Sequence, residues 1–338
     1  MRSSNKSRNS ALITAGSTRA RTGLPGRPDY EQETAIKTCW KNYHTPKTVE
    51  EAIETLNHYD GRAQVIGGGT DLLLEIQQGR RAPVEAMVDT SRIAGLDRIH
   101  VEDDQITIGC AVSHSRITED KRLVQHGTCL VEGCGVIGGP QVRNVATLAG
   151  NVAHALPAAD GTIALLALAA EIETADIQGR HRMSLQQAFL GPGKSAIDHH
   201  RTLLTHLRFR ATGALEGSAF HRVMRPQGVA LPMIAMAACL QLDESHRIIS
   251  VRIAIGPAGP VPCLAEKAME VLTGGPASME QFEKASEAAL AALSLRSSRY
   301  RASSEYRRSM IRTQLPSVLA LAAERAKAGH AGALGVEQ

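Results

Sequence analysis

Apolar residues recur along this chain with two spacings, and each change of spacing marks an expected element. Every third or fourth residue is apolar between residues 49 and 57, which predicts a helix. Thr48 and Glu51 form a capping box at its start, because each can bond the other's backbone N–H group. Short apolar runs then predict strands at 63–67, 86–90 and 105–110. The chain thus opens with one helix followed by three short strands.

Beyond residue 110, helical and strand patterns form separate blocks. Helical spacing covers 115–137, a turn-rich stretch follows at 138–151, and an apolar helix is expected from about Asp160 to Ala170. Strands are expected after it at 171–177, 203–209, 218–223, 233–242 and 247–256. Helices then close the chain at 264–273, 279–293 and 304–325. The segregation of strands and helices in the last third indicates a separate α+β domain.

Composition allows two domains and places the net charge in one segment. With 338 residues and 43% hydrophobic content, the chain can build two cores. Aliphatic residues must dominate these cores, because only 3% of the residues are aromatic. The net charge is +4, and residues 1–38 hold all of it, with seven basic against three acidic side chains. The remaining body is neutral, which argues against nucleic acid as the main partner.

Residues 1–38 are rich in Ser, Arg, Thr and Gly and have no apolar periodicity. We therefore expect a disordered basic extension and not a secretory signal. No apolar stretch in the sequence is long enough to span a bilayer, so no membrane association is expected. The six cysteines contain no Cys-x-x-Cys pair, which suits a reducing compartment. These features predict a soluble cytoplasmic protein.

Two glycine-rich stretches carry the candidate chemistry. The first, VIGGGTDLLLE, places three glycines after a β-branched pair; the second, TLAGNVAHALPAADG, begins at Thr147 at the end of an expected β-like stretch. Glycines allow φ > 0 or the close approach of another group, and two loops that present backbone N–H groups could wrap a pyrophosphate. For any single residue a structural role is the alternative: a glycine turn, Asn151 in the left-handed region, or Asp160 as an N-cap.

A dinucleotide-binding fold of the Rossmann type is one alternative. A strand, Gly67-x-Gly69, a helix and a second strand ending in Asp89 follow one another in the order that this fold requires. However, Leu72 stands where the third glycine is needed, and residues 70–79 are barely long enough for a crossover helix. The Rossmann interpretation also gives the second glycine-rich stretch no role.

Other catalytic patterns are missing from the sequence. His114, His154 and His221 show no metal-ligand spacing, so we interpret them as surface or internally bonded histidines. No Gly-x-Ser-x-Gly elbow is present, and nucleophilic hydrolysis therefore has no support.

Taken together, the two loops and their surroundings resemble the FAD-binding medium subunit of molybdenum hydroxylases, the family of carbon monoxide dehydrogenase and xanthine dehydrogenase. The resemblance runs from about Trp40 to Lys327. Its motifs are YHTPKTVEEAIETL at the start, GGGTDLL and GGPQVRNVATLAGNVAHALPAAD in the loops, and SSEYRRSM near the end. Gly67 replaces the family's usual alanine, and Leu148 and Ala149 depart from its Thr-Ile-Gly-Gly-Asn pattern.

The resemblance implies an α+β fold with a two-subdomain FAD-binding domain of the vanillyl-alcohol oxidase type at 39–214 and a smaller α+β C-terminal domain at 215–338. It also implies that FAD is bound by residues of the two loops, the following helix and a later strand: Ile66, Gly67, Gly68, Gly69, Thr70, Asp71, Thr147, Gly150, Asn151, Asp160 and Arg222. Phe220 and Arg222 stand where the family has Tyr and Lys. A surface arginine on an edge strand is the equal alternative for Arg222. No catalytic residue and no metal ligand is expected.

The same resemblance implies electron transfer within a complex. FAD accepts electrons one or two at a time, so this chain would pass electrons from iron–sulfur centres to an external acceptor. The sequence has no cysteine pattern for a [2Fe–2S] centre and should be one component of a complex. By resemblance, a small [2Fe–2S] subunit and a large molybdopterin subunit complete it, as a dimer of heterotrimers. Two alternatives stay open: a free-standing FAD-dependent oxidoreductase of the same fold, and a non-redox nucleotide-binding scaffold.

Removal of residues 1–38 should leave flavin binding intact. These residues precede the region of resemblance and show no periodicity, so we expect no core contact from them. A truncated chain that begins at Cys39 should fold and hold FAD in the same molar ratio as the full chain, measured by flavin absorption per polypeptide. Loss of folding or of flavin in the truncated chain would identify an ordered element in this segment.

Overall fold

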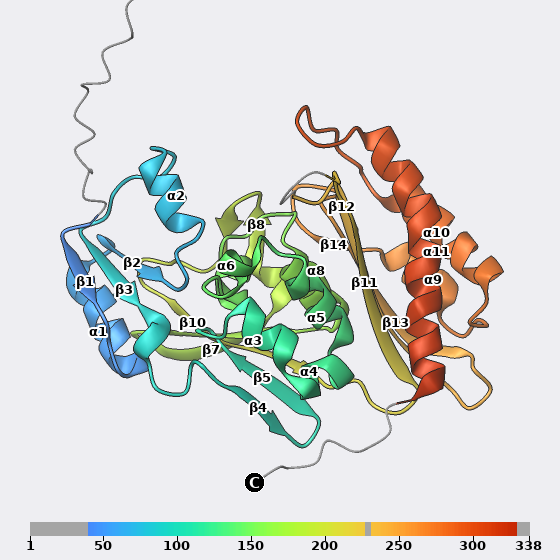
Figure 1. The fold of residues 1–338 in the computed structure, drawn as a ribbon, viewed down its shortest axis with the longest axis horizontal. Coiled ribbons are helices and arrows are strands. Elements are labelled where there is room, and N and C mark those ends of the chain that lie inside the picture. Colours follow the sequence, from blue (N-terminus) through green and yellow to red (C-terminus); the bar gives the residue numbers. More distant parts are fainter. Residues whose placement is uncertain (1–39, 227–230, 330–338) are drawn as a thin grey trace, which may run out of the picture. The chain divides into compact units, whose positions relative to one another are not determined.

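The computed structural model describes residues 40–226 and 231–329 of the chain. The predictions for residues 1–38, and for the cysteine at position 39, lie outside the described residues. Three sheets of three or more strands organise the described part, and helices pack on each of them (Figure 1).

The first sheet is small and parallel, with the strand order β1-β3-β2. Its strands and the two helices between them are β1 (Asn42–His44), α1 (Val49–Tyr59), β2 (Ala63–Ile66), α2 (Leu72–Gln77) and β3 (Ala86–Asp89). The predicted cap of α1 is present, since the Thr48 side chain accepts a hydrogen bond from the backbone N–H of Glu51. The Glu51 carboxylate accepts from the N–H of Lys47, one residue before the position that a capping box predicts.

The second sheet is antiparallel, with the strand order β4-β5-β10-β6-β7. Its strands are β4 (Ile99–Glu102), β5 (Gln105–Gly109), β6 (Glu171–Asp176), β7 (Gly179–Ser184) and β10 (Leu203–Arg210). β10 inserts between β5 and β6, which both precede it in the chain, and pairs with each of them. The sequence did not predict β7, because this strand buries none of its side chains and has no apolar alternation.

Six helices lie in the chain between β5 and β6. The helices are α3 (His114–Glu119), α4 (Lys121–His126), α5 (Thr128–Gly135), α6 (Pro140–Arg143), α7 (Leu148–Ala153) and α8 (Asp160–Ala167). The minor elements of the chain are η1 (Thr90–Arg92), η2 (Leu185–Ala188) and the hairpin of β8 (Phe189–Gly191) and β9 (Lys194–Ser195). Every residue of α8 is buried, which explains why this helix is apolar on all sides.

The third sheet is antiparallel, with the order β11-β12-β13-β14, and forms the C-terminal part of the chain with three helices. These elements are β11 (Glu216–Val223), β12 (Ile234–Leu242), β13 (Ile248–Gly256), β14 (Cys263–Leu264), α9 (Glu266–Leu272), α10 (Met279–Ala292) and α11 (Ser304–Ala328). Helices α5 and α8 pack on one face of this sheet, and α9 and α11 pack on the other (Figure 1).

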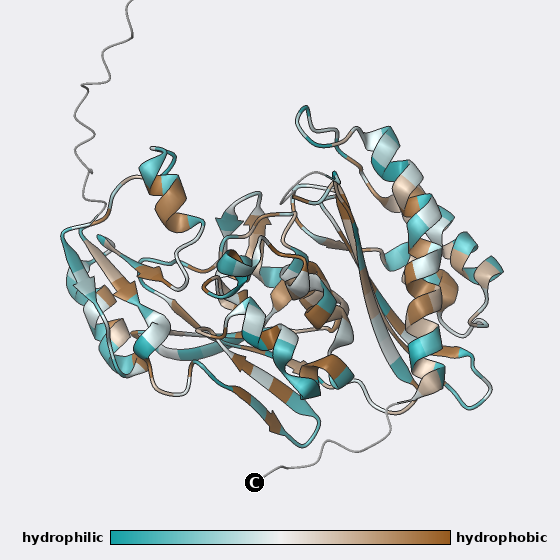
Figure 2. Cartoon of the chain, viewed as in Figure 1, coloured by the Kyte–Doolittle hydropathy of each residue, from teal (hydrophilic) through white to brown (hydrophobic). Residues whose placement is uncertain are grey.

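Strand β12 shows how one sheet serves two cores. Ala235 and Ala237 belong to the core that includes α8, whereas Ile234 and Met236 belong to the core of the C-terminal helices. Because both faces are buried, the strand is apolar from Ile234 to Leu240 and does not alternate. Apolar residues accordingly run along this sheet and the helices on both sides of it in Figure 2. The small side chains on one face allow α8 to lie close to the sheet.

The α+β fold predicted from the sequence is confirmed. One local prediction was wrong, because the turn-rich stretch at 138–151 contains α6 and the first four residues of α7. Both helices are shorter than two full turns, too short to show a periodic pattern. Within residues 40–226 and 231–329, no helix combines the length and the apolar character needed to cross a membrane.

Substitution of Ala237 by leucine should destabilise the protein. The Ala237 side chain is fully buried against the α8 side, so three added carbon atoms would overpack the interface by about 1–3 kcal/mol. Met236→Leu is the matched control on the opposite face and conserves volume, so it should cost less than about 1.5 kcal/mol. Urea unfolding of both variants measures the difference. An equal effect of the two would contradict the close packing of α8.

Candidate functional site

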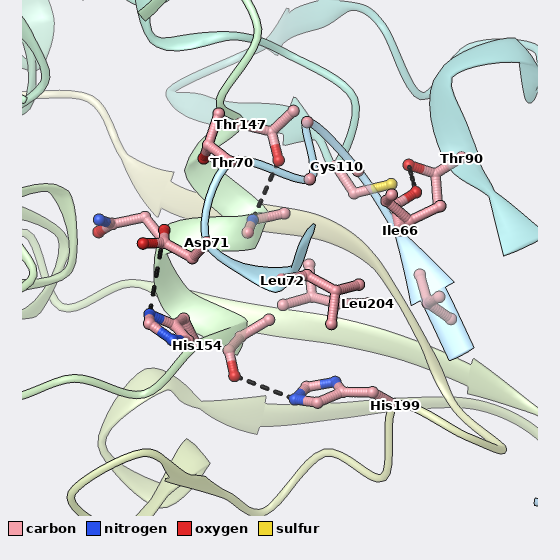
Figure 3. Close-up of a pocket in the computed structure, with 18 of the residues that line it drawn as sticks. Ile66, Thr70, Asp71, Leu72, Thr90, Cys110, Thr147, His154, His199 and Leu204 are labelled. Atoms are coloured by element: carbon pink, nitrogen blue, oxygen red, sulfur yellow. Dashed lines mark hydrogen bonds and ion pairs between the residues drawn. The ribbon is translucent and has the colours of Figure 1, made fainter. Parts of the chain in front are cut away.

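A cavity opens where the two glycine-rich loops meet (Figure 3). Three segments form most of its wall: the loop between β2 and α2, the start of α7, and residues 199–204 before and within β10. Most residues predicted from the resemblance line this cavity: Ile66, Gly67, Gly68, Gly69, Thr70, Asp71, Thr147, Gly150 and Asn151. Asp160 and Arg222 do not.

The first loop presents free backbone donors. Among the described residues, the N–H groups of Gly68, Gly69 and Thr70 have no hydrogen-bond acceptor. Gly69 has φ +68°, a conformation that favours glycine. Consecutive free N–H groups on a concave wall form a site for an anion such as a diphosphate.

Gly68 permits a close approach, and the group that approaches it is the backbone of the second loop. A Cβ atom at Gly68 would lie 2.7 Å from the carbonyl carbon of Val145 and 2.8 Å from the Cα atom of Ala146. The missing side chain therefore allows the first loop to touch the backbone of the second loop. The two loops are held together by this contact even before any ligand is considered.

Thr147 lies between both loops. It is the N-cap of α7, and its Oγ1 atom accepts a hydrogen bond of 3.0 Å from the N–H of Gly150. A Cβ atom at Gly67 or at Gly150 would lie 3.1 Å from the same Oγ1 atom. The expectation that Thr147 ends a β-like stretch was wrong, since it makes only an isolated bridge with Ser113. Its role as a cap places it against the glycines of both loops.

Asn151 connects the second loop to α8. Its Oδ1 atom accepts hydrogen bonds of 3.2 Å from both the backbone N–H and the hydroxyl group of Thr162. The backbone of Asn151 lies within the helix α7. It therefore does not adopt the left-handed conformation that was the structural alternative.

A chain of charged side chains bridges α2 and the end of α7 beside the cavity. Glu75 accepts from His154 at 2.9 Å and from Arg81 at 3.2 Å. Asp71 lies 4.0 Å from the His154 ring (Figure 3). Burial opposes ionisation, but the hydrogen bond and charge of His154, with Arg81, lower the pKa of Glu75 overall. His154 is therefore internally bonded, as the sequence analysis expected, and it also lines the cavity.

Two buried polar groups in the cavity wall lack partners among the described residues. They are the Oε1 atom of Gln64 and the Nδ1 atom of His114. Burial, with a smaller contribution from the charge of Arg143, lowers the pKa of His114 to about 4, so this ring is neutral at physiological pH. The interpretation of His114 as surface or internally bonded was wrong. Neither residue belongs to a motif, so no sequence pattern pointed to this role for them.

Asp160 and Arg222 form a buried ion pair next to this site. The Arg222 Nη1 and Asp160 Oδ2 atoms are 2.7 Å apart, and the two side chains are 8% and 4% exposed. Burial raises the pKa of Asp160 to about 6, although Arg222 opposes the shift. Arg222 lies on the edge strand β11, but the alternative of a surface arginine was wrong. Phe220 is buried on the same strand, and its N–H donates to Glu132.

The Rossmann alternative fails at Asp89. Its carboxylate accepts hydrogen bonds from the Tyr43 hydroxyl and from the backbone and hydroxyl of Ser91, so it is not directed to a ribose. Over the described ranges, no group of three or more His, Cys, Asp or Glu side chains has the arrangement of a metal site.

Comparisons with known proteins agree with this geometry. A family model described as "FAD binding domain in molybdopterin dehydrogenase" matches residues 35–212, and one described as "CO dehydrogenase flavoprotein C-terminal domain" matches residues 218–321. The xanthine dehydrogenase FAD-binding subunit of Escherichia coli O157:H7 is 29% identical over 279 residues, which cover 82% of this chain and 94% of that protein.

Two further similarities extend over most of the chain. The nicotinate dehydrogenase FAD-subunit of Eubacterium barkeri is 28% identical over 245 residues, covering 71% of this chain and 82% of that protein. A solved structure of carbon monoxide dehydrogenase from Hydrogenophaga pseudoflava superposes with a TM-score of 0.79 at 25% identity. That match covers 84% of this chain and 97% of the other.

Replacement of Gly68 by alanine should separate the two loops. The added Cβ atom meets backbone atoms that cannot rotate away, so we expect a loss of about 1–3 kcal/mol in the free energy of unfolding of the flavin-free chain. Flavin affinity should fall as well. Gly259→Ala is the control, because a Cβ atom there meets nothing within 4 Å. Wild-type stability and flavin content in Gly68→Ala would show that the loops are not in contact at this point.

Proposed function

Since the chain belongs to the family of FAD-binding subunits of molybdenum hydroxylases, an oxidoreductase family with FAD as cofactor, we propose that it passes electrons from iron–sulfur centres to an external acceptor. The observation that carries this proposal is the row of free N–H groups at Gly68, Gly69 and Thr70 in a cavity formed by two loops. A diphosphate between the loops would accept hydrogen bonds from these groups.

The residues present fit FAD in three respects. The glycines allow the two loops to pack together around the cavity, because a Cβ atom at Gly68 would meet backbone atoms and one at Gly67 or Gly150 would crowd the Thr147 hydroxyl group. The unpartnered atoms of Gln64 and His114 offer buried hydrogen-bonding groups that a cofactor can satisfy. The remaining predicted residues of the cavity would bind the same cofactor through backbone or side-chain contacts: Ile66, Asp71 and Asn151.

We assign Asp160 and Arg222 to the flavin-ring end of the site. Each keeps one buried atom without a partner among the described residues, Oδ1 of Asp160 and Nε of Arg222. A polar edge of a flavin ring could engage these atoms while the ion pair stays intact. The pair also joins α8 to β11, so it would fix the ring relative to both parts of the chain.

FAD supplies the redox chemistry, because it exchanges one or two electrons at a time. The chain's own residues bind and orient it. The contact at Gly68 sets the distance between the loops, and the neutral His114 places no charge on the wall. The side chains of Glu75, His154 and Arg81 close the site where α2 meets α7.

The chain would act together with two partner subunits. We propose a small [2Fe–2S] subunit as electron donor and a large molybdopterin subunit that oxidises the substrate, assembled as a dimer of heterotrimers. We also propose that residues 39–214 act as the FAD-binding domain and 215–338 as the C-terminal domain. The two family matches, which are separated between residues 212 and 218, support this division.

The isolated chain should carry flavin and still fail to hydroxylate aldehyde, purine or aromatic substrates. Electrons should pass between a reduced donor and a dye, because bound flavin can perform that step alone. Substrate oxidation should return only when the [2Fe–2S] and molybdenum subunits are both added. The measurement is turnover by the purified polypeptide after metal analysis. Oxidation of an organic substrate at a normal enzymatic rate by the metal-free chain would replace this proposal with the free-standing flavoenzyme.

A further inference from the structure

Gln64 is a buried polar residue in the middle of a strand. Alternate residues of β2 face opposite sides, and Ala63 and Val65 pack with the large core. Gln64 therefore points to the other side, together with Ile66 and beside its cross-strand partner Met87, toward the small core under α2. The side chain is 3% exposed and lines the cavity.

The carboxamide of Gln64 is unsatisfied in the chain itself. Its Oε1 atom has no hydrogen-bond donor within the described ranges. Two other polar side chains of the same cavity are already engaged, since Arg81 bonds to Glu75 and the His199 ring bonds to the carbonyl oxygen of Ala153. A buried polar atom without a partner destabilises a fold, so its presence in a ligand cavity points to a ligand.

The surroundings of Gln64 suit a flat, uncharged ring. Residues 199–204 run along the free edge of β2, where the N–H of Val65 donates to His199 at 3.0 Å. Leu203 and Leu204 are buried and line the cavity from that segment. Apolar walls with a single amide group are typical of sites that bind an aromatic base and orient it by one polar edge.

The position of Gln64 along β2 indicates that it lies beside the adenine half of the cofactor. Gln64 lies three residues before Gly67, or about 10 Å along an extended strand. From a diphosphate at the glycine loops, one direction leads to Gln64 and the other to Asp160 and Arg222. The proposed function assigns the flavin ring to Asp160 and Arg222, so the ring does not lie at Gln64. The adenosine is left for the end at Gln64.

We propose that Gln64 recognises the adenine ring of FAD through its carboxamide, with Oε1 accepting from the exocyclic N6 amino group and Nε2 donating to the ring nitrogen N7. Paired hydrogen bonds of this kind are the usual contact between glutamine and adenine. The inference rests on the proposed FAD site and adds a residue that selects the base. A cofactor with hypoxanthine in place of adenine carries an oxygen at the N6 position and cannot donate to Oε1.

The geometry also predicts opposite effects on the free and the loaded protein. Gln64→Leu removes an unsatisfied buried group from the flavin-free chain, so its thermal midpoint should stay equal or rise. The same substitution removes the adenine contact, so affinity for FAD should fall. A residue that is only structural would change both quantities in the same direction.

The test compares FAD with flavin hypoxanthine dinucleotide. Flavin-free full-length protein is titrated with each compound, and binding is followed by the quenching of flavin fluorescence. Wild type should bind FAD about 10- to 100-fold more tightly than the hypoxanthine compound. In Gln64→Leu, FAD affinity should drop until the two compounds bind nearly equally. Thermal unfolding of the same flavin-free samples reports whether the variant is folded.

Leu204→Ala is the matched control on the same wall. It removes apolar packing from either base. It should therefore weaken the binding of both compounds by a similar factor and keep the ratio of their two affinities unchanged. Equal binding of the two compounds by wild type, or an unchanged ratio in Gln64→Leu, would overturn the role of Gln64 while leaving the FAD site itself intact. Failure of wild type to bind either compound would instead remove the FAD site and this proposal with it.

Discussion

The backbones of the two glycine-rich loops touch at Gly68, and the cavity depends on this contact. A side chain at that position would meet the backbone of Val145 and Ala146, so the loops could not approach. Thr147 sits directly beside the contact and caps α7, which directs the start of that helix toward the first loop. Packing between the two loops therefore positions both the free N–H groups and the capped helix. The N–H groups remain available as donors to a ligand.

The C-terminal sheet gives this site a support that the loops alone lack. One face of this sheet carries alanines that pack against α8. The other face carries larger side chains that pack against the C-terminal helices. Two ion pairs connect the helices near the site to the C-terminal part of the chain. Asp160 of α8 pairs with Arg222 of β11, and Glu132 of α5 pairs with Arg325 of α11 at 2.5 Å. Since Thr162 of α8 also donates two hydrogen bonds to the Asn151 side chain, the second loop is held through α8 by the sheet.

Much of the fold was predictable from the sequence because most elements are either amphipathic or apolar runs. The helices α1, α10 and α11 and the strands β12 and β13 were predicted within a few residues. The strand β7 and the short helices α6 and α7 were not, since they lack periodic apolar positions. Motifs located the loops, but the reason for Gly68, the neutrality of His114 and the unsatisfied Gln64 depend on neighbours distant in the chain.

The insertion of β10 between β5 and β6 sets an order for biosynthesis. While the ribosome is still making residues up to 202, β5 and β6 have no strand between them, and their exposed edges can pair with other chains. β10 also brings Leu203 and Leu204 to the cavity. The wall of the proposed cofactor site is therefore incomplete until β10 has emerged.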